Sequence, residues 1–304
     1  MSHVSPISGT SLVRVVLWMS GALLSFSVMA VSVRELAANL SIFEILAIRS
    51  GTGVLVLSVL VLLSPTLRLM VVPRRMGIHL LRNTAHYAGQ YMWALSLTLL
   101  PLATVFSLEI TMPAWTMLLA TFFLGEPLTR SRIAAVILGI VGVLIILRPG
   151  LATFQPASLL VLAAAFAYAV SMINTKQLTA TQSAFAIIFW MNVMQLPMSL
   201  VGSSLDFPLR LTSADILPVL GIGLSGMTSH YCLSNAFRAG SAGMVVPLDF
   251  MRIPLIAWVG WWLYNESLDI FVFIGALTIV TGVIWNLHAE TRPAVPRAER
   301  QPAA

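Results

Sequence analysis

Four ionisable side chains stand inside long apolar runs of this chain. They are Arg49, Glu109, Asp249 and Arg252. An ionisable group near the centre of a bilayer costs at least ~2.5–3.5 kcal/mol on insertion scales, so each of them needs a partner or water. Carboxylates can bind an ammonium group or a proton, and arginines can bind a carboxylate. The four could equally be ion pairs that lock helices together, and the sequence leaves both interpretations open.

Two polar stripes accompany these charges. His86 and Gln90 are four residues apart, so they share one face of a helix, and Tyr91 lies beside them. A second run places His230 and Tyr231 in the same way. A histidine titrates near neutrality and could couple the site to protons; a hydrogen bond between helices is the alternative. One stripe in each half of the chain predicts a shared aqueous cavity, which these five residues would line with the four charges.

The expected depths of the charges suggest which of them meet. Glu109 and Arg49 lie about six and seven residues from the same end of their helices, which is a similar depth at 1.5 Å per residue. A pair between Glu109 and Arg49 is therefore geometrically possible. Arg252 follows Asp249 by three residues, one helical turn away on a similar face.

Composition indicates that lipid is the solvent of this protein. Of its 304 residues, 58% are hydrophobic and 9% are charged, and the mean hydropathy is +0.92. A soluble domain carries about 25% charged residues. The net charge of +6 comes from scattered basic residues, so it does not predict a nucleic-acid partner. The single cysteine, Cys232, excludes an intramolecular disulfide and a multi-cysteine metal site, and we expect no metal and no cofactor.

Ten apolar stretches approach the roughly 20 residues that a membrane-spanning helix needs. The sequence therefore predicts an all-α membrane protein whose short connections leave no room for a soluble domain. The expected spans are 14–33, 42–63, 78–99, 103–123, 132–147, 158–174, 183–203, 216–237, 244–264 and 270–288.

The basic residues predict the orientation of these spans, because cytoplasmic loops are enriched in Lys and Arg. With both termini in the cytoplasm, twelve of the 17 basic residues fall on the cytoplasmic side, and only Arg34, Arg148 and Arg210 fall in outer loops. Arg49 and Arg252 fall within spans. We therefore expect a multi-pass protein of the cell inner membrane with both ends in the cytoplasm.

The chain also resembles itself at a shift of 140 residues. Ser107–Glu109 then lies over Pro247–Asp249, and Glu126 lies over Glu266. Five spans per copy is an odd number, so the second copy must cross the membrane with the opposite orientation. Such inverted repeats are common in secondary transporters, whose substrate site lies near the midplane between the repeats. The expected divisions are a cytoplasmic N-terminus (1–13), repeat 1 (14–147), a linker (148–157), repeat 2 (158–288) and a cytoplasmic tail (289–304).

A family resemblance follows from one element of each repeat. The segment Tyr91–Gly150 contains Leu-Gly-Glu-x-Leu at Leu124–Leu128, and its counterparts are Asn235–Phe250 and Trp261–Leu268. Over about residues 14–288 the chain resembles the drug/metabolite transporter superfamily, the EamA-type ten-helix carriers.

The resemblance implies a secondary transporter, not an enzyme, that moves a small polar molecule by alternating access. Export of an amino-acid-derived or zwitterionic metabolite is the preferred expectation. The stretch Arg82–Gln90 is similar to a branch that we associate with opine-type metallophores. Uptake of a metabolite such as S-adenosylmethionine is the alternative. The bilayer and a small-molecule substrate are the expected partners, protons are the candidate coupling ion, and the sequence does not indicate an oligomeric state.

Other motifs have competing interpretations. Gly221–Gly226 satisfies G-x-G-x-x-G, but small residues in an apolar helix usually permit close helix packing. The same stretch contains Gly-Leu-Ser-Gly, which allows an intramembrane serine hydrolase using Ser225 if a histidine activates it; a lipid-carrier translocase is a third alternative. Prolines within the fourth and ninth spans predict kinks. Glu126 and Glu266 follow those spans, and we expect them to cap or fix the connections.

Overall fold

The computed structural model describes residues 9–125, 129–148, 155–204, 206–239, 245 and 248–291, and within these ranges its regular elements are all helices. The two short 3₁₀ helices are η1 (Phe207–Arg210) and η2 (Ser213–Asp215). The α-helices are α1 (Gly9–Leu36), α2 (Ile42–Leu63), α3 (Pro65–Met70), α4 (Met76–Leu99), α5 (Leu102–Glu109), α6 (Met112–Leu124), α7 (Arg130–Leu147), α8 (Ser158–Thr179), α9 (Ala184–Val201), α10 (Ile216–Ala239), α12 (Arg252–Tyr264) and α13 (Ile270–Thr291).

The helices form a bundle that crosses the membrane several times. Seven of the described helices or helix pairs are long and apolar enough to cross a bilayer, and a shorter apolar helix covers Ile270–Asn286. Only 28% to 44% of each apolar window is buried inside the protein. The rest exposes side chains such as Leu55, Leu62 and Phe122. Such apolar surfaces are compatible with lipid, and this explains why only 9% of the residues are charged.

The predicted span 103–123 is not one helix. It breaks at Ile110–Thr111 into α5 and α6, because Pro113 has no N–H to donate to the carbonyl of Glu109 one turn earlier. A second break at Phe250–Met251 precedes α12, where Pro254 likewise cannot donate to the Phe250 carbonyl. The kinks expected at Pro113 and Pro254 are therefore present as short breaks, and Leu102–Phe123 still forms one stretch long enough to cross the membrane.

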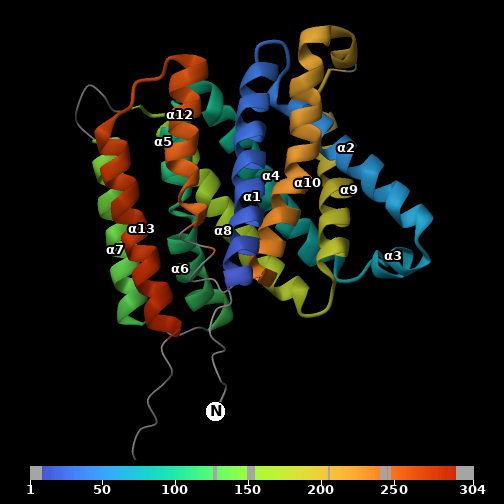
Figure 1. Ribbon diagram of the computed structural model, residues 1–304. Coiled ribbons are helices and arrows are strands. Elements are labelled where there is room, and N and C mark those ends of the chain that lie inside the picture. The colour runs from blue at the N-terminus through green and yellow to red at the C-terminus, as the bar shows by residue number, and fades with distance from the viewer. Residues whose placement is uncertain are drawn as a thin grey trace, which may run out of the picture.

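Helices that are distant in sequence pack in pairs. α1 packs along α10, α4 along α8, α2 along α9, α7 along α13, and α5 against α12. Figure 1 shows that α1 begins and α13 ends at the same end of the bundle, which we call the terminal end. The opposite end, where α5 begins and α12 ends, is called the far end.

Glycines bring α7 and α13 into backbone contact. A Cβ atom added to Gly142 would lie 2.6 Å from the Gly275 carbonyl oxygen, and one added to Gly275 would lie 2.6 Å from the Gly142 carbonyl oxygen. No Cβ atom fits at such a distance from a backbone atom, so only glycine permits this packing. Close approach through small residues is a common way to hold membrane helices together.

Several sequence predictions fall on residues outside the described ranges. These are Glu126, Pro247, the first eight residues and the tail from 292 onward, together with the part of the linker at 149–154.

The contact between α7 and α13 yields a stability prediction. Gly142→Ala must push the helices apart and should destabilise the protein by about 1–3 kcal/mol, as overpacking does. The matched control is Gly139→Ala on the same helix, where the added atom would meet only the Ala114 Cβ at 3.7 Å, an ordinary contact. Thermal unfolding in detergent should show a lower melting temperature for the first variant alone. Equal melting temperatures would contradict the packing described.

Candidate functional site

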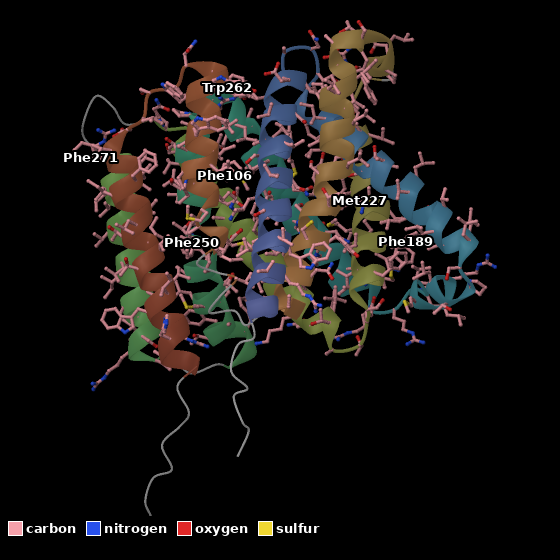
Figure 2. The ribbon with its side chains drawn as sticks, viewed as in Figure 1. Phe106, Phe189, Met227, Phe250, Trp262 and Phe271 are labelled. Atoms are coloured by element: carbon pink, nitrogen blue, oxygen red, sulfur yellow. The ribbon has the colours of Figure 1, made fainter. Side chains whose placement is uncertain are left out.

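Arg252, the first residue of α12, lies among charged and aromatic side chains at the second helix break. Its Nη2 is 3.1 Å from Asp249 Oδ2, and its Nη1 is 3.7 Å from Glu109 Oε1. Its guanidinium carbon lies 4.9 Å from the ring centre of Phe26 and 5.5 Å from that of Phe106. The two helix breaks thus bring both predicted carboxylates, Glu109 and Asp249, next to Arg252. Figure 2 shows Phe106 and Phe250 near the middle of the bundle's height.

Glu109, the last residue of α5, has a second partner. Trp93 Nε1 on α4 donates a hydrogen bond to Glu109 Oε2 at 2.9 Å, and the Trp93 ring meets Phe106 edge-on. The predicted possibility of a pair between Glu109 and Arg49 is wrong, because the cation beside Glu109 is Arg252. The break at Ile110–Thr111 brings α5 against α12, and the depth argument made for straight helices cannot anticipate this contact.

Arg49 on α2 is buried, and the described part of the chain gives it no counter-charge. Only 6% of the residue is exposed, it has no ion pair among the described residues, and its Nε and Nη1 have no hydrogen-bond partner within them. The guanidinium lies against α10, where a Cβ atom added to Gly226 would be 2.9 Å from Arg49 Nε. A buried charge with neither a partner nor water is strongly unfavourable.

Arg82 is a second buried arginine, and sequence reasoning missed it by assigning it to the cytoplasmic side of the membrane. It lies within α4 and is 8% exposed. Its Nε donates to Thr175 Oγ1 at 3.2 Å and its Nη1 to Asn83 Oδ1 at 2.7 Å, both neutral acceptors. The spacing of His79, Asn83 and His86 could have indicated that Arg82 lies within the helix, because these residues place a polar face on both sides of it.

The two arginines lie near both predicted histidines. Arg49 and Arg82 are close enough to interact electrostatically with each other, with His86 and with His230. We call Arg49, Arg82, His86 and His230 the basic group. It joins α2, α4 and α10 and holds no carboxylate among the described residues.

His86 and Gln90 share the inward face of α4, as predicted. Gln195 Nε2 on α9 lies 3.0 Å from His86 Nδ1, and the His86 ring centre is 5.5 Å from that of Tyr168 on α8. Gln90 is 7% exposed, and its Oε1 has no hydrogen-bond partner in the described part of the chain. Tyr168 is close enough to both Glu109 and Arg49 to interact electrostatically with each.

The structure does not bring the other two predicted residues to this centre. The ring of Tyr91 lies 4.7 Å from that of Phe43 near the start of α2. Tyr231 is 63% exposed and meets Trp18 edge-on between α10 and α1. Spacing along one helix could not distinguish these outer positions from inner ones, because it does not say which helices are neighbours.

Glu266 fixes a connection at the far end, as predicted. Its Oε2 accepts a hydrogen bond from Leu102 N–H at 2.9 Å, which caps α5, and its other oxygen forms an ion pair with Arg34 at the end of α1. Arg34 also donates to the carbonyls of Leu97 at 2.7 Å and Leu100 at 2.5 Å. One carboxylate therefore ties the ends of three helices together.

Two more ion pairs lie at the far end. Arg210 pairs with Glu44, which also accepts a hydrogen bond from the backbone of Ser204 at 3.2 Å. Arg148 pairs with Asp269, and its guanidinium lies over the ring of Phe271. These contacts connect the start of α2 with the segment after α9, and the end of α7 with the segment after α12.

The glycine-rich stretch of α10 serves packing, as expected. A Cβ atom added to Gly221 would lie 2.2 Å from Ser32 Oγ, and one added to Gly223 would lie 2.8 Å from Thr52 Oγ1. Ser225 is buried, and its Oγ has no hydrogen-bond partner in the described ranges. No histidine there is positioned to activate this hydroxyl.

These features define a membrane transport protein: apolar helices that expose their flanks to lipid and gather charges at two helix breaks. The EamA-like transporter family matches residues 13–148 and 155–287, and the chain belongs to that family. The resemblance to the drug/metabolite transporter superfamily is thereby confirmed. The protein is a transporter and not an enzyme, so the alternative of a serine hydrolase using Ser225 is wrong.

The chain is similar to transporters of two named molecules. It is 25% identical to an S-adenosylmethionine uptake transporter of Rickettsia bellii over 71% of this chain and 74% of the relative. It is 28% identical to a riboflavin transporter of Rhizobium johnstonii over 74% and 73% of the two chains. A solved crystal structure matches with a TM-score of 0.59 over 93% of this chain and 98% of the other, at 16% identity, which supports the fold alone.

Replacing Glu266 tests its role at the far end. Glu266→Ala leaves the Leu102 N–H and the Arg34 charge without partners and should destabilise the protein by about 1–3 kcal/mol. Glu266→Gln keeps an acceptor for the N–H and should cost less. Thermal unfolding of both variants in detergent measures the difference. A melting temperature unchanged by Glu266→Ala would rule out the capping role.

Proposed function

We propose that the chain is a secondary carrier of ten spans, arranged as two five-helix repeats that cross the membrane in opposite orientations. The observation that carries the proposal is the pair of helix breaks. Glu109 precedes one break and Asp249 precedes the other, and these two acids coincide at the repeat shift of 140 residues. Broken helices at corresponding places in two repeats mark the binding site in many transporters.

The helix pairs support the same symmetry. If the second repeat starts at α8, then α1 corresponds to α8 and α10 to α4, so the pair α1–α10 exchanges with α8–α4. The pairs α2–α9 and α7–α13 each exchange with themselves. A twofold axis in the membrane plane would relate these four pairs. The family match to each half of the chain fits this division.

Transport by alternating access follows from this arrangement. The substrate would bind between the repeats near the two breaks, where Arg252 lies among Glu109 and Asp249. Ion pairs at the far end, including Arg34 with Glu266, would close that end while the site opens toward the terminal end. When one repeat rocks against the other, these ion pairs would break and the far end would open, while contacts at the terminal end would close that end. Coupling of transport to protons through His86 stays a prediction.

We propose a location in the inner membrane with both termini in the cytoplasm. The beginning of α1 and the end of α13 lie at one end of the bundle (Figure 1), which agrees with an even number of crossings. The outer loops would then carry Arg34, Arg148 and Arg210, each of which has a carboxylate partner. The terminal end would face the cytoplasm.

We further propose that the protein takes up a small polar metabolite of the size of a nucleoside or an amino-acid conjugate. The relatives named for S-adenosylmethionine uptake support this direction. Export of an opine-type metallophore, the direction preferred from the sequence, has no support from these relatives and is an outcome of the flux test.

Flux into proteoliposomes tests the carrier and its charged centre together. We expect the wild-type protein to exchange labelled S-adenosylmethionine or riboflavin, and Asp249→Asn to slow that exchange by about tenfold or more, because Arg252 then loses its nearer carboxylate. The matched control is Asp206→Asn in an exposed loop, which should transport normally. Loading a metabolite mixture either inside or outside the proteoliposomes measures the direction of transport. Absence of flux for every solute would overturn the carrier.

Topology reporters test the repeat arrangement independently. We expect a cytoplasm-active reporter fused to either end of the chain to be active, because ten crossings return the chain to its starting side. Activity at only one end would require an odd number of crossings, which two oppositely oriented five-helix repeats cannot produce.

A further inference from the structure

We propose that the basic group is a subsite for an oxyanion of the transported molecule, a carboxylate or a phosphate, and that Arg49 and Arg82 bind it. Its role in transport rests on the function proposed above. The subsite is separate from the centre at Arg252.

The arginines of the structure differ in how their charges are balanced. Arg34, Arg148, Arg210 and Arg252 each have an acidic partner. Arg49 and Arg82 are buried at 6% and 8% exposure, yet neither has a carboxylate among the described residues. Removing a guanidinium from water without a counter-ion is strongly unfavourable, so an anion supplied from outside would be bound favourably.

Arg252 is a poor receptor for an anion by the same reasoning. Asp249 lies 3.1 Å and Glu109 3.7 Å from its guanidinium nitrogens, so a substrate carboxylate would meet two negative charges there. Arg49 offers the opposite conditions, with two nitrogens, Nε and Nη1, that have no hydrogen-bond partner in the described ranges. Arginine presents its donors in a fork that fits carboxylate and phosphate oxygens.

The surroundings of Arg49 leave room for its guanidinium beside α10. Gly226 lets it lie against the backbone of α10, where any added Cβ atom would come within 2.9 Å of Nε. Tyr168 is close enough to both Arg49 and Glu109 to interact electrostatically with each. Among the described residues Glu109 and Asp249 pair with Arg252 and not with Arg49, so an anion on Arg49 would not meet a carboxylate already bound there. Those carboxylates suit a cationic group. This arrangement favours a substrate with opposite charges at its two ends, or one with a single anionic group.

Matched pairs of probes test the subsite in the purified full-length protein. The carboxylate pair is S-adenosylmethionine and its methyl ester, and the phosphate pair is riboflavin 5′-phosphate and riboflavin. We expect the wild type to bind the member that carries the carboxylate or phosphate about tenfold more tightly in at least one pair. Arg49→Gln and Arg82→Gln should abolish that preference and leave the affinity for the member without this oxyanion unchanged. The control, Arg68→Gln at an exposed arginine, should keep the preference.

The outcomes separate the subsite from the carrier. A preference in the carboxylate pair alone assigns a carboxylate, and one in the phosphate pair alone assigns a phosphate. Arg49→Lys keeps the charge and should retain part of the preference, which distinguishes recognition from a folding defect. No preference in the wild type, or an equal loss for both members in Arg49→Gln, overturns the subsite. An intact preference without any flux overturns the proposed function and leaves the subsite standing.

Discussion

Hydrogen bonding of the backbone in a solvent without water is the constraint on which the rest of this structure depends. Lipid cannot satisfy an N–H or C=O group, so a crossing segment must satisfy its own groups, and helices result. The breaks at Ile110–Thr111 and Phe250–Met251 are tolerable because they lie inside the bundle, where Arg252 and Glu109 meet. Proline creates the breaks by removing a donor, and the freed turn brings charged side chains together that a continuous helix would keep apart.

Much of the fold follows from the sequence because apolar length is a strong signal. The expected spans match the described helices α2, α7 and α9 to within about two residues, the usual uncertainty of helix ends. The importance of Glu109, Asp249 and Arg252 also follows from the sequence, because charges in apolar runs are rare.

The partner of Glu109 could not be predicted from the sequence, since it depends on where a helix breaks. Arg82 was missed because its neighbours in sequence resemble a cytoplasmic loop, and the outward position of Tyr231 depends on which helix packs beside α10.

The buried charges form two sets that differ in their internal balance. At Arg252, two carboxylates surround one guanidinium, and aromatic rings cover it. In the basic group, two guanidinium groups stand without an acid among the described residues, and Thr175 and Asn83 give Arg82 only neutral acceptors. By formal charge, one set carries a negative excess and the other a positive excess, and Tyr168 interacts electrostatically with a member of each.

The glycine contact between α7 and α13 has a mechanical consequence. Side chains normally act as a compliant layer between helices and let one helix slide on another by rotamer changes. At Gly142 and Gly275 that layer is missing, and the two main chains touch directly. These helices also border the bundle at one side (Figure 1). We therefore expect α7 and α13 to move together as one rigid unit, with any displacement during transport taken up at their contacts with the other helices.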